Sequence, residues 1–273
     1  MTSETGGGAM PDEHIEELAR QLMQARTTRQ AVALPAGFAA HCDQASATRI
    51  AARHQKLVLE RHGGRVIGCK LGGTNREALT RLGLARPFVG PIFSAFTHAS
   101  GVTLPRAEFL RCVIEAEVAV RLGRPLDARA GPIDRPTLLD AIEALFPVIE
   151  IADSRLAGFP ALPPAAITAD LGFGAALVMG APCADWRGQD LASASVRLLV
   201  NGEAVRDGSG AAVLGDPLNA LAEFAAQAAA EGRMVPAGEL VSTGTWTAPY
   251  MAQAQEHIVA DFGSLGRVEL RLG

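Results

Sequence analysis

The sequence predicts an α+β fold whose catalytic core is mainly β. Apolar residues recur with helical spacing before residue 65, and predicted strands outnumber helices after it. No segment repeats with the period of roughly 20 to 50 residues that is typical of solenoids and propellers. We therefore divide the 273-residue chain into a flexible tail over residues 1–11, an N-terminal helical region over 12–64 and a catalytic β-rich domain over 65–273.

The helical region contains two predicted helices. Ile15, Leu18 and Leu22 fall on one face of the first helix, and the second begins near Ser46 and ends at Gly63. The other elements are predicted from alternation, from proline in a first helical turn and from an Asn-Gly turn. They are strands at residues 66–71, 113–122, 146–151, 239–245 and 268–272, a hairpin at 196–205, and helices at 136–145 and 218–230.

The composition favours a small-molecule partner. The chain has a net charge of -4 and a pI near 5.9, and it has no basic cluster suited to nucleic acid or to a membrane surface. The N-terminus lacks the basic and apolar segments of a signal peptide, so we expect a cytoplasmic protein. The cysteines are scattered, which predicts reduced and mostly buried thiols rather than zinc or disulfides. They are Cys42, Cys69, Cys112 and Cys183.

Three glutamates in predicted strands indicate a metal site. Strand alternation places Glu115 and Glu117 on the same face, and Glu150 lies in the middle of an otherwise apolar strand. Carboxylates in such surroundings need a compensating cation, and an all-oxygen set suits Mg²⁺ or Mn²⁺ better than zinc or copper. The alternative is a solvated sheet face combined with a buried pair between glutamate and Arg155 or Arg111.

Lysine is rare in this chain. The 25 basic residues are arginines except for Lys56 and Lys70, and Lys70 ends the strand that leads into residues 72–74 (GGT). A lysine is compact, and burial or a nearby cation can lower its pKa into the catalytic range. Lys70 is therefore a candidate catalytic residue, and the alternative is a strand-end side chain that reaches solvent. The glycines after it can bring backbone N–H groups close to an anionic substrate.

Two further segments are open to two interpretations each. Residues 153–155 (DSR) follow the Glu150 strand, where they either lie near the metal or form a structural turn with an arginine cap. Residues 243–245 (TGT) either line the site with hydroxyl groups or end a strand. No spacing typical of a Ser/His/Asp triad occurs, so nucleophilic hydrolysis has no support, and His98 is the one histidine kept as a candidate.

Four segments together resemble a known enzyme family. They are residues 68–74 (GCKLGGT), 115–119 (EAEVA), 148–155 (VIEIADSR) and 210–221 (GAAVLGDPLNAL). In this order they resemble the 2-hydroxypenta-2,4-dienoate (2-keto-4-pentenoate) hydratase and 4-oxalocrotonate decarboxylase family, within the fumarylacetoacetate hydrolase superfamily. The resemblance extends from about residue 14 to the C-terminus.

The resemblance implies a mixed β-sheet roll of the fumarylacetoacetate hydrolase C-terminal type with an N-terminal helical region, in a homo-oligomer. It also implies Mg²⁺ or Mn²⁺ bound by Glu115, Glu117 and Glu150. The implied substrate is a small 2-oxo acid that chelates this metal, so that enolate charge is stabilised where it develops. The implied catalytic residues are Lys70 and Asp170, and the implied substrate-binding residues are Leu71, Thr74, Arg155, Phe173, Thr243 and Thr245.

Such an enolate leads to two reactions. Hydration by a 2-keto-4-pentenoate hydratase-like lyase is the first prediction, and decarboxylation of a 2-oxo-3-enedioate such as 4-oxalocrotonate is the second. A C–C bond hydrolase of the acylpyruvate type and a non-catalytic partner subunit are further alternatives. Two departures from the family pattern bear on the choice. Residues 87–90 (PFVG) lack an acidic residue that members often carry there, and Leu171 and Phe173 replace polar side chains.

Overall fold

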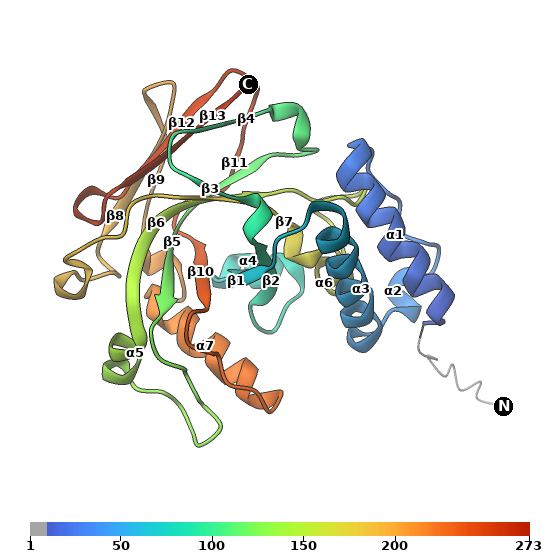
Figure 1. Ribbon diagram of the computed structural model, residues 1–273, viewed down its shortest axis with the longest axis horizontal. Helices are drawn as coiled ribbons and strands as arrows, with labels where there is room; N and C mark the ends of the chain where they lie inside the picture. The colour runs from blue at the N-terminus through green and yellow to red at the C-terminus, as the bar shows by residue number, and fades with distance from the viewer. Residues whose placement is uncertain (1–9) are drawn as a thin grey trace.

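The computed structural model describes residues 10–273, which form two β-sheets with helices at their margins (Figure 1). Residues 1–9 of the predicted tail lie outside the described residues. The helices are α1 (Asp12–Thr28), α2 (Phe38–His41), α3 (Gln44–His62), α4 (Arg76–Leu82), α5 (Arg135–Ala141), α6 (Pro164–Ala169) and α7 (Pro217–Ala230). The strands are β1 (Val66–Gly72), β2 (Phe88–Phe93), β3 (Thr97–Ala99), β4 (Val102–Leu104), β5 (Val113–Leu122), β6 (Ile142–Ala152), β7 (Gly174–Met179), β8 (Ser195–Val200), β9 (Glu203–Ser209), β10 (Leu240–Thr245), β11 (Tyr250–Met251), β12 (His257–Asp261) and β13 (Arg267–Leu272).

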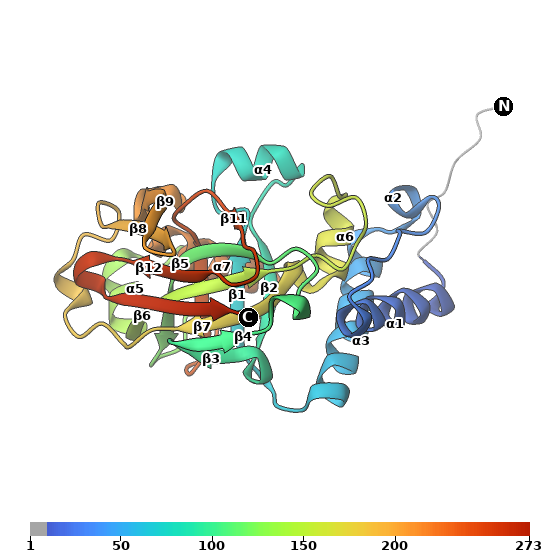
Figure 2. The same cartoon turned by 90° about the horizontal axis from the view of Figure 1, so that it is seen from above.

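The first three helices lie at one end of the molecule, at the right of Figure 1. Ile15, Leu18 and Leu22 are buried on α1, which packs against α3, so the predicted helical periodicity is confirmed. The Asp43 side chain accepts the N–H of Ser46 and caps the start of α3. Figure 2, seen from above, shows these helices at the opposite end of the long axis from β8 and β9. The division of the chain into domains stays a prediction.

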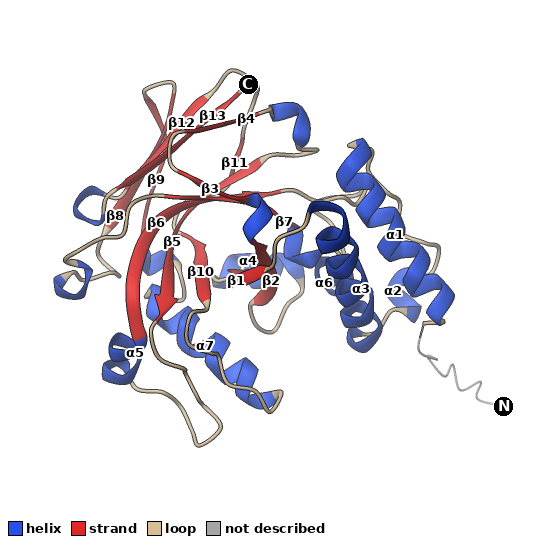
Figure 3. Ribbon diagram, viewed as in Figure 1, coloured by secondary structure: helices blue, strands red, loops and turns tan. Residues whose placement is uncertain are grey.

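The larger sheet is mixed and curled. Its eight strands follow the order β2-β1-β10-β5-β6-β7-β3, with β11 paired to β5. The β1–β10 and β3–β7 pairs are parallel and the other pairs are antiparallel. Although β2 and β7 are far apart in this order, they contact each other because the sheet curls. The predicted α+β class and mixed-sheet roll are therefore confirmed, with helices placed around the sheets (Figure 3).

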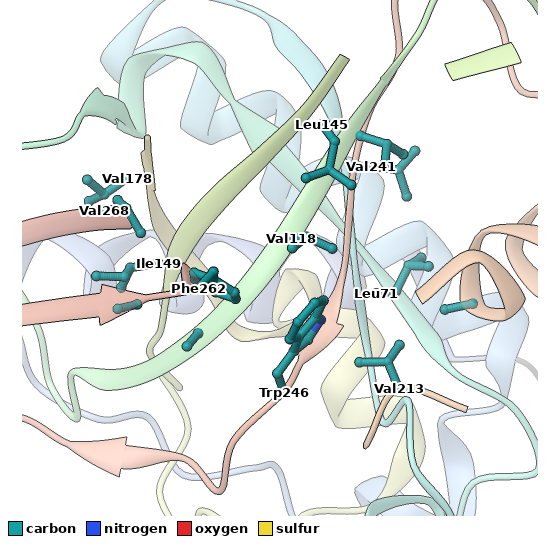
Figure 4. Packing of buried hydrophobic residues seen from close by; sticks show 14 of the residues in the cluster. Leu71, Val118, Leu145, Ile149, Val178, Val213, Val241, Trp246, Phe262 and Val268 are labelled. Carbon is teal, nitrogen blue, oxygen red and sulfur yellow. The ribbon is translucent and has the colours of Figure 1, made fainter. Parts of the chain in front are cut away.

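The main hydrophobic core lies against one face of the larger sheet. Residues of this sheet pack there with the second sheet, whose five strands have the order β4-β13-β12-β8-β9, and with α7. The labelled members in Figure 4 are Leu71, Val118, Leu145, Ile149, Val178, Val213, Val241, Trp246, Phe262 and Val268. The rings of Trp246 and Phe262 meet edge to face with centroids 5.3 Å apart. Successive side chains of a strand alternate, so the opposite face of the sheet remains for other contacts.

The helix predicted at residues 136–145 is wrong over its second half. Helix α5 ends at Ala141, and β6 begins at Ile142 and pairs with β5. Ile142 and Leu145 are buried, as expected for either structure, and apolar spacing over so few residues does not separate a helical turn from the start of a strand. Pairing along the whole of β5 stabilises the strand.

Most other predicted elements are confirmed. Strands β8 and β9 form the predicted hairpin, and Asn201 and Gly202 have φ of 52° and 90°, as a tight turn with left-handed residues requires. The strands predicted at 66–71, 113–122, 239–245 and 268–272 correspond to β1, β5, β10 and β13, and the helix at 218–230 is α7. The sequence did not indicate the short strands β2, β3, β4, β7, β11 and β12. Within residues 10–273, no helix is both long and apolar enough to cross a membrane.

Strands β1 and β10 approach each other closely at Gly68, which yields a first prediction. A Cβ at this position would lie 1.9 Å from the carbonyl oxygen of Leu240 in the neighbouring strand. Gly68→Ala should therefore push the strands apart and lower the free energy of unfolding by about 1–3 kcal/mol, measured by urea denaturation. Gly188→Ala is the matched control, because no atom lies within 4 Å of its added Cβ. Equal stability of the two variants would contradict the close approach.

Candidate active site

The three predicted glutamates lie together on the face of the larger sheet that is turned away from the main core. Strand β5 carries Glu115 and Glu117, and β6 carries Glu150 directly opposite Glu115 in the strand register. Each glutamate offers one carboxylate oxygen, and these oxygens all lie within 4.8 Å of one another. Glu117 and Glu150 are 1% and 2% exposed, so solvent cannot neutralise their mutual repulsion.

Lys70 reaches the same cluster from β1. Its Nζ lies 2.8 Å from Oε1 of Glu150, and the residue is 3% exposed. The buried partner of Glu150 is therefore Lys70, and neither the Arg155 pair nor the Arg111 pair considered as an alternative is present. Burial by itself lowers the pKa of Lys70, but the charges of Glu150 and Glu115 raise it more, and the net pKa lies above the ordinary value. The side chain is an ammonium group in this environment.

One side-chain donor and one backbone donor hold the carboxylate of Glu117 in place. Its Oε2 accepts hydrogen bonds from Ser242 Oγ at 2.6 Å and from the N–H of Gly244 at 3.0 Å. Gly244 has φ of 109°, and a Cβ there would lie 2.0 Å from Oγ1 of Thr74. This strand-end turn thus brings β10 and the segment after β1 into contact beside Glu117. The sequence analysis missed Ser242, whose position next to the TGT segment was the available signal.

The cluster brings three carboxyl groups together with one ammonium group. Burial, followed by the charge of Glu150, raises the pKa of Glu115 to about 7, and burial with the charges of Glu150 and Glu115 raises the pKa of Glu117 well above its ordinary value. Lys70 is the donor beside Oε1 of Glu150, and within residues 10–273 Oε2 of Glu150 is buried without a hydrogen-bond partner. A buried carboxylate oxygen without a donor fits a hard divalent cation, since such ions take oxygen ligands.

Glycines make room for an aromatic ring over Lys70. The ring centroid of Phe88 lies 4.9 Å from Nζ of Lys70, and a Cβ at Gly72 would lie 2.1 Å from this ring. A Cβ at Gly90 would lie 3.2 Å from Cε of Lys70 and 2.4 Å from the carbonyl oxygen of Leu171. The glycines of the lysine motif therefore serve the packing around Lys70.

The departures from the family pattern meet in space. Phe173 packs edge to face on Phe88, with centroids 6.3 Å apart, and on Phe159 at 5.6 Å. Residues 171–173, between α6 and β7, all have positive φ, with values of 53°, 61° and 65°. Left-handed backbone is costly for leucine and phenylalanine, so the surrounding contacts must hold this turn in place.

Asp170 and Arg155 form a separate, fully buried pair. Nε of Arg155 lies 2.6 Å from Oδ1 of Asp170, and the backbone N–H of Arg155 donates to Oδ2 at 2.8 Å. Burial raises the pKa of Asp170, and the neighbouring Arg155 opposes this rise. The carboxylate of Asp153 accepts N–H groups of residues 110–112. For residues 153–155, the structural turn is therefore the interpretation that these hydrogen bonds support.

The remaining predicted substrate-binding residues differ in what they touch. The side chain of Leu71 packs in the main core, on the face opposite to Lys70. Thr243 Oγ1 donates to the carbonyl of Val118, and Thr245 Oγ1 donates to the carbonyl of Thr247. Thr74 is buried beside Gly244. The hydroxyls of the TGT segment thus hold backbone, and their contact with substrate stays a prediction.

A small cavity, partly open to solvent, adjoins Lys70 and Glu150. Its other walls are residues 91–93 of β2, Phe96 and residues 174–177 of β7. Apolar walls with a few convergent polar groups are typical of small-molecule sites. The described geometry therefore combines a set of three clustered carboxylates, a buried ammonium group and an apolar cavity.

The chain also matches a known protein family by sequence. The fumarylacetoacetate (FAA) hydrolase C-terminal family matches residues 69–272, and the chain belongs to this family. A 2-keto-4-pentenoate hydratase of Paraburkholderia phymatum is 30% identical over 259 residues, which cover 94% of this chain and 97% of the relative. A 4-oxalocrotonate decarboxylase of Pseudomonas putida is 30% identical over 212 residues, covering 78% and 79%.

A solved structure agrees with these relatives. The 4-oxalocrotonate decarboxylase from Pseudomonas putida G7, complexed with magnesium and adipate, superposes with a TM-score of 0.88 and 27% sequence identity. The match covers 97% of this chain and 99% of that chain, so it includes the N-terminal helices. The expected resemblance to the hydratase and decarboxylase family is confirmed.

The raised pKa values of the glutamates predict how pH and metal act on stability. In metal-stripped protein, Glu115 and Glu117 hold protons that the unfolded chain has already released, so the free energy of unfolding should fall as pH rises from about 4.5 to about 7. A divalent cation binds the deprotonated form, so Mg²⁺ or Mn²⁺ should raise the Tm more at pH 7.5 than at pH 5.5. Thermal unfolding with and without EDTA measures both effects. A metal-induced gain that is equal in Glu117→Gln would contradict this site.

The Arg155–Asp170 pair yields a stability prediction. Asp170→Ala leaves a buried guanidinium without its carboxylate, which should lower the free energy of unfolding by about 3–5 kcal/mol in urea denaturation. The control is Asp207→Ala, because the Arg197–Asp207 pair is exposed and screened by solvent. A loss of activity in Asp170→Ala without loss of stability would instead support a direct catalytic role for Asp170.

Proposed function

We propose that this chain is a divalent-metal-dependent lyase that acts on a small unsaturated 2-oxo or 2-hydroxydienoic acid, with hydration as its reaction. The cluster of Glu115, Glu117, Glu150 and Lys70 carries this proposal, because it lies in a chain that one hydratase relative matches over 94% of its length. Decarboxylation of a 2-oxo-3-enedioate is the second candidate, supported by the structural match to the decarboxylase.

The three glutamates would hold Mg²⁺ or Mn²⁺, since both ions prefer oxygen ligands. The bound cation supplies positive charge to the oxygens of a 2-oxo acid, where an enolate develops negative charge. Glu117 is oriented for this task by Ser242 and Gly244, which occupy only one of its oxygens. Lys70 orients Glu150 in the same way from the other side of the cluster.

Lys70 is the proposed catalytic acid and carboxylate contact. Its ammonium form is stabilised by the glutamates, so it has a proton to deliver to the enolate and a charge to attract an anionic substrate. Phe88 lies over this ammonium group and, with Phe173, excludes water from it. In this proposal Asp170 holds Arg155 and the turn at residues 171–173 in place. The other residues shape the site through their packing and backbone contacts; they are Leu71, Thr74, Thr243 and Thr245.

The other candidates lack a comparable observation. A C–C bond hydrolase needs a base that activates water, and no histidine of residues 10–273 lines the cavity at Lys70. A non-catalytic subunit would gain nothing from three clustered carboxylates, two of them buried, because such a cluster destabilises the fold when no cation compensates it. A homo-oligomeric state and a cytoplasmic location stay predictions from the sequence.

Variants of the charge cluster separate metal binding from chemistry. Lys70→Met should lower kcat by about 10²–10⁴-fold while Mg²⁺ still raises the Tm, because the carboxylates remain. Glu117→Gln should remove both turnover and the metal-induced gain in Tm. Lys56→Met is the control, since the side chain of Lys56 is 67% exposed and pairs with Glu60 rather than with the cluster.

The assay follows the ultraviolet absorbance of 2-hydroxypenta-2,4-dienoate and of 2-oxohex-3-enedioate, with EDTA-stripped and metal-loaded protein, and identifies products by mass. Metal-dependent gain of water supports the hydratase, and loss of CO₂ supports the decarboxylase. Wild-type turnover in Lys70→Met would overturn the role of Lys70. Metal binding without conversion of either compound would overturn both proposed reactions.

A further inference from the structure

A second cavity, partly open to solvent, lies between the ends of the N-terminal helices and the larger sheet. Arg26 and Arg29 line it at the end of α1, and His62 lines it at the end of α3. Neither Lys70 nor any residue of the glutamate cluster belongs to its walls. The proposed function therefore does not account for this cavity.

The guanidinium of Arg26 is buried and only partly satisfied. Arg26 is 7% exposed, and it forms no ion pair with an acid among residues 10–273. Its Nη2 donates to the carbonyl of Gly174 at 2.9 Å, whereas its Nε is buried without a hydrogen-bond partner in this part of the chain. Buried donors are normally satisfied and buried charges are normally paired. An unsatisfied guanidinium in a cavity wall therefore indicates a ligand that is an anion.

A second guanidinium adds to the positive charge at this point. Nη1 of Arg155 donates to the same carbonyl of Gly174, at 3.2 Å. Arg155 is compensated by its pair with Asp170, whereas Arg26 has no such pair. Burial, followed by the charge of Arg155, lowers the pKa of Arg26 to about 9, so the guanidinium is still charged at neutral pH. An anion beside Arg26 would offset both effects.

The other titratable groups of the cavity do not compensate Arg26. The carboxylate of Asp153 accepts three backbone N–H groups, and Glu108 is exposed. Arg29 is half-buried and forms no ion pair within the described residues. Burial lowers the pKa of His62 and of His98, so neither imidazole adds charge at neutral pH. Arg26 and Arg29 are thus the two cations that an anion entering the cavity would meet.

The remaining walls are apolar. They consist of Phe96, Leu104, Phe109 and residues 175–176. The ring of Phe96 also supports the guanidinium, since its centroid lies 5.3 Å from Cζ of Arg26. Apolar walls with a few convergent polar groups are typical of sites for small organic molecules. Such walls suit a carboxylate with a short apolar body better than a strongly hydrated inorganic anion.

We propose that Arg26, with Arg29 beside it, binds a small monocarboxylate with a short apolar body in this cavity. A guanidinium is suited to the role because it donates parallel hydrogen bonds to the two oxygens of a carboxylate. The site requires no metal, since no residue of the glutamate cluster takes part in it. For the same reason this inference does not depend on the proposed function.

The test compares a carboxylate with its uncharged analogue of the same size. EDTA-stripped protein at pH 7.5 and constant ionic strength is titrated with butyrate and with butyramide in a calorimeter. Butyrate should bind at least about tenfold more tightly, as one charge-assisted contact provides. In Arg26→Gln this ratio should fall toward one. The matched control is Arg20→Gln on the same helix, whose exposed side chain pairs with Glu17, and its ratio should equal that of the wild type.

Each other outcome would overturn the site or its ligand. Equal affinities in the wild type, or no binding of butyrate, would overturn the carboxylate site without the need for any variant to fold. Binding of butyrate only after Mg²⁺ is added would place it at the glutamates and overturn the separate site. Binding of inorganic phosphate but not of butyrate would assign the cavity to an inorganic anion. An unchanged ratio in Arg26→Gln would overturn the role of Arg26.

Discussion

The pairing of β5 with β6 is the constraint on which the site depends. Their register sets Glu115 opposite Glu150 and Glu117 opposite Val148, so three carboxylates share one face while Val118, Ile149 and their neighbours share the other. A shift of one residue in either strand would turn that strand's glutamates into the main core and its core residues into the site. The hydrophobic packing of one face therefore fixes the position of the charges on the other.

Compensation of buried charge differs across the molecule. Asp170 and Arg155 satisfy each other completely, with side-chain and backbone hydrogen bonds, and such a closed pair specifies structure. The glutamate cluster has Lys70 as its cation and retains an oxygen without a donor. Arg26 donates to the carbonyl of Gly174 and has no ion pair with an acid among residues 10–273. The incompletely compensated groups border the cavities, which is where a cation and an anionic ligand can complete them.

The aromatic contacts over Lys70 show how the departures from the family pattern act together. Phe88, at the start of β2, and Phe173, just before β7, are 85 positions apart in the sequence, yet their rings are in contact and Phe88 covers the ammonium group. The left-handed turn at residues 171–173 places Phe173 there. The two rings thus shield the ammonium group of Lys70, and neither of them lines the cavity beside it.

The sequence by itself determined the α+β class, the first helices, the Asn-Gly hairpin and the shared face of Glu115 and Glu117, because these follow from local periodicity and turn chemistry. It also singled out Glu150 and Lys70, as charged residues in apolar strands. It failed at residues 142–145, where pairing with β5 overrides local spacing.

Only the tertiary structure decided which charges meet. Glu150 pairs with Lys70 rather than with an arginine, and Asp170 pairs with Arg155. Ser242 donates to Glu117, and Arg26 donates to the carbonyl of Gly174. These contacts join residues from about 15 to about 150 positions apart, as the sequence numbers show. Strand order and sheet curvature set such distances, and periodicity along one strand carries no information about its neighbours in the sheet.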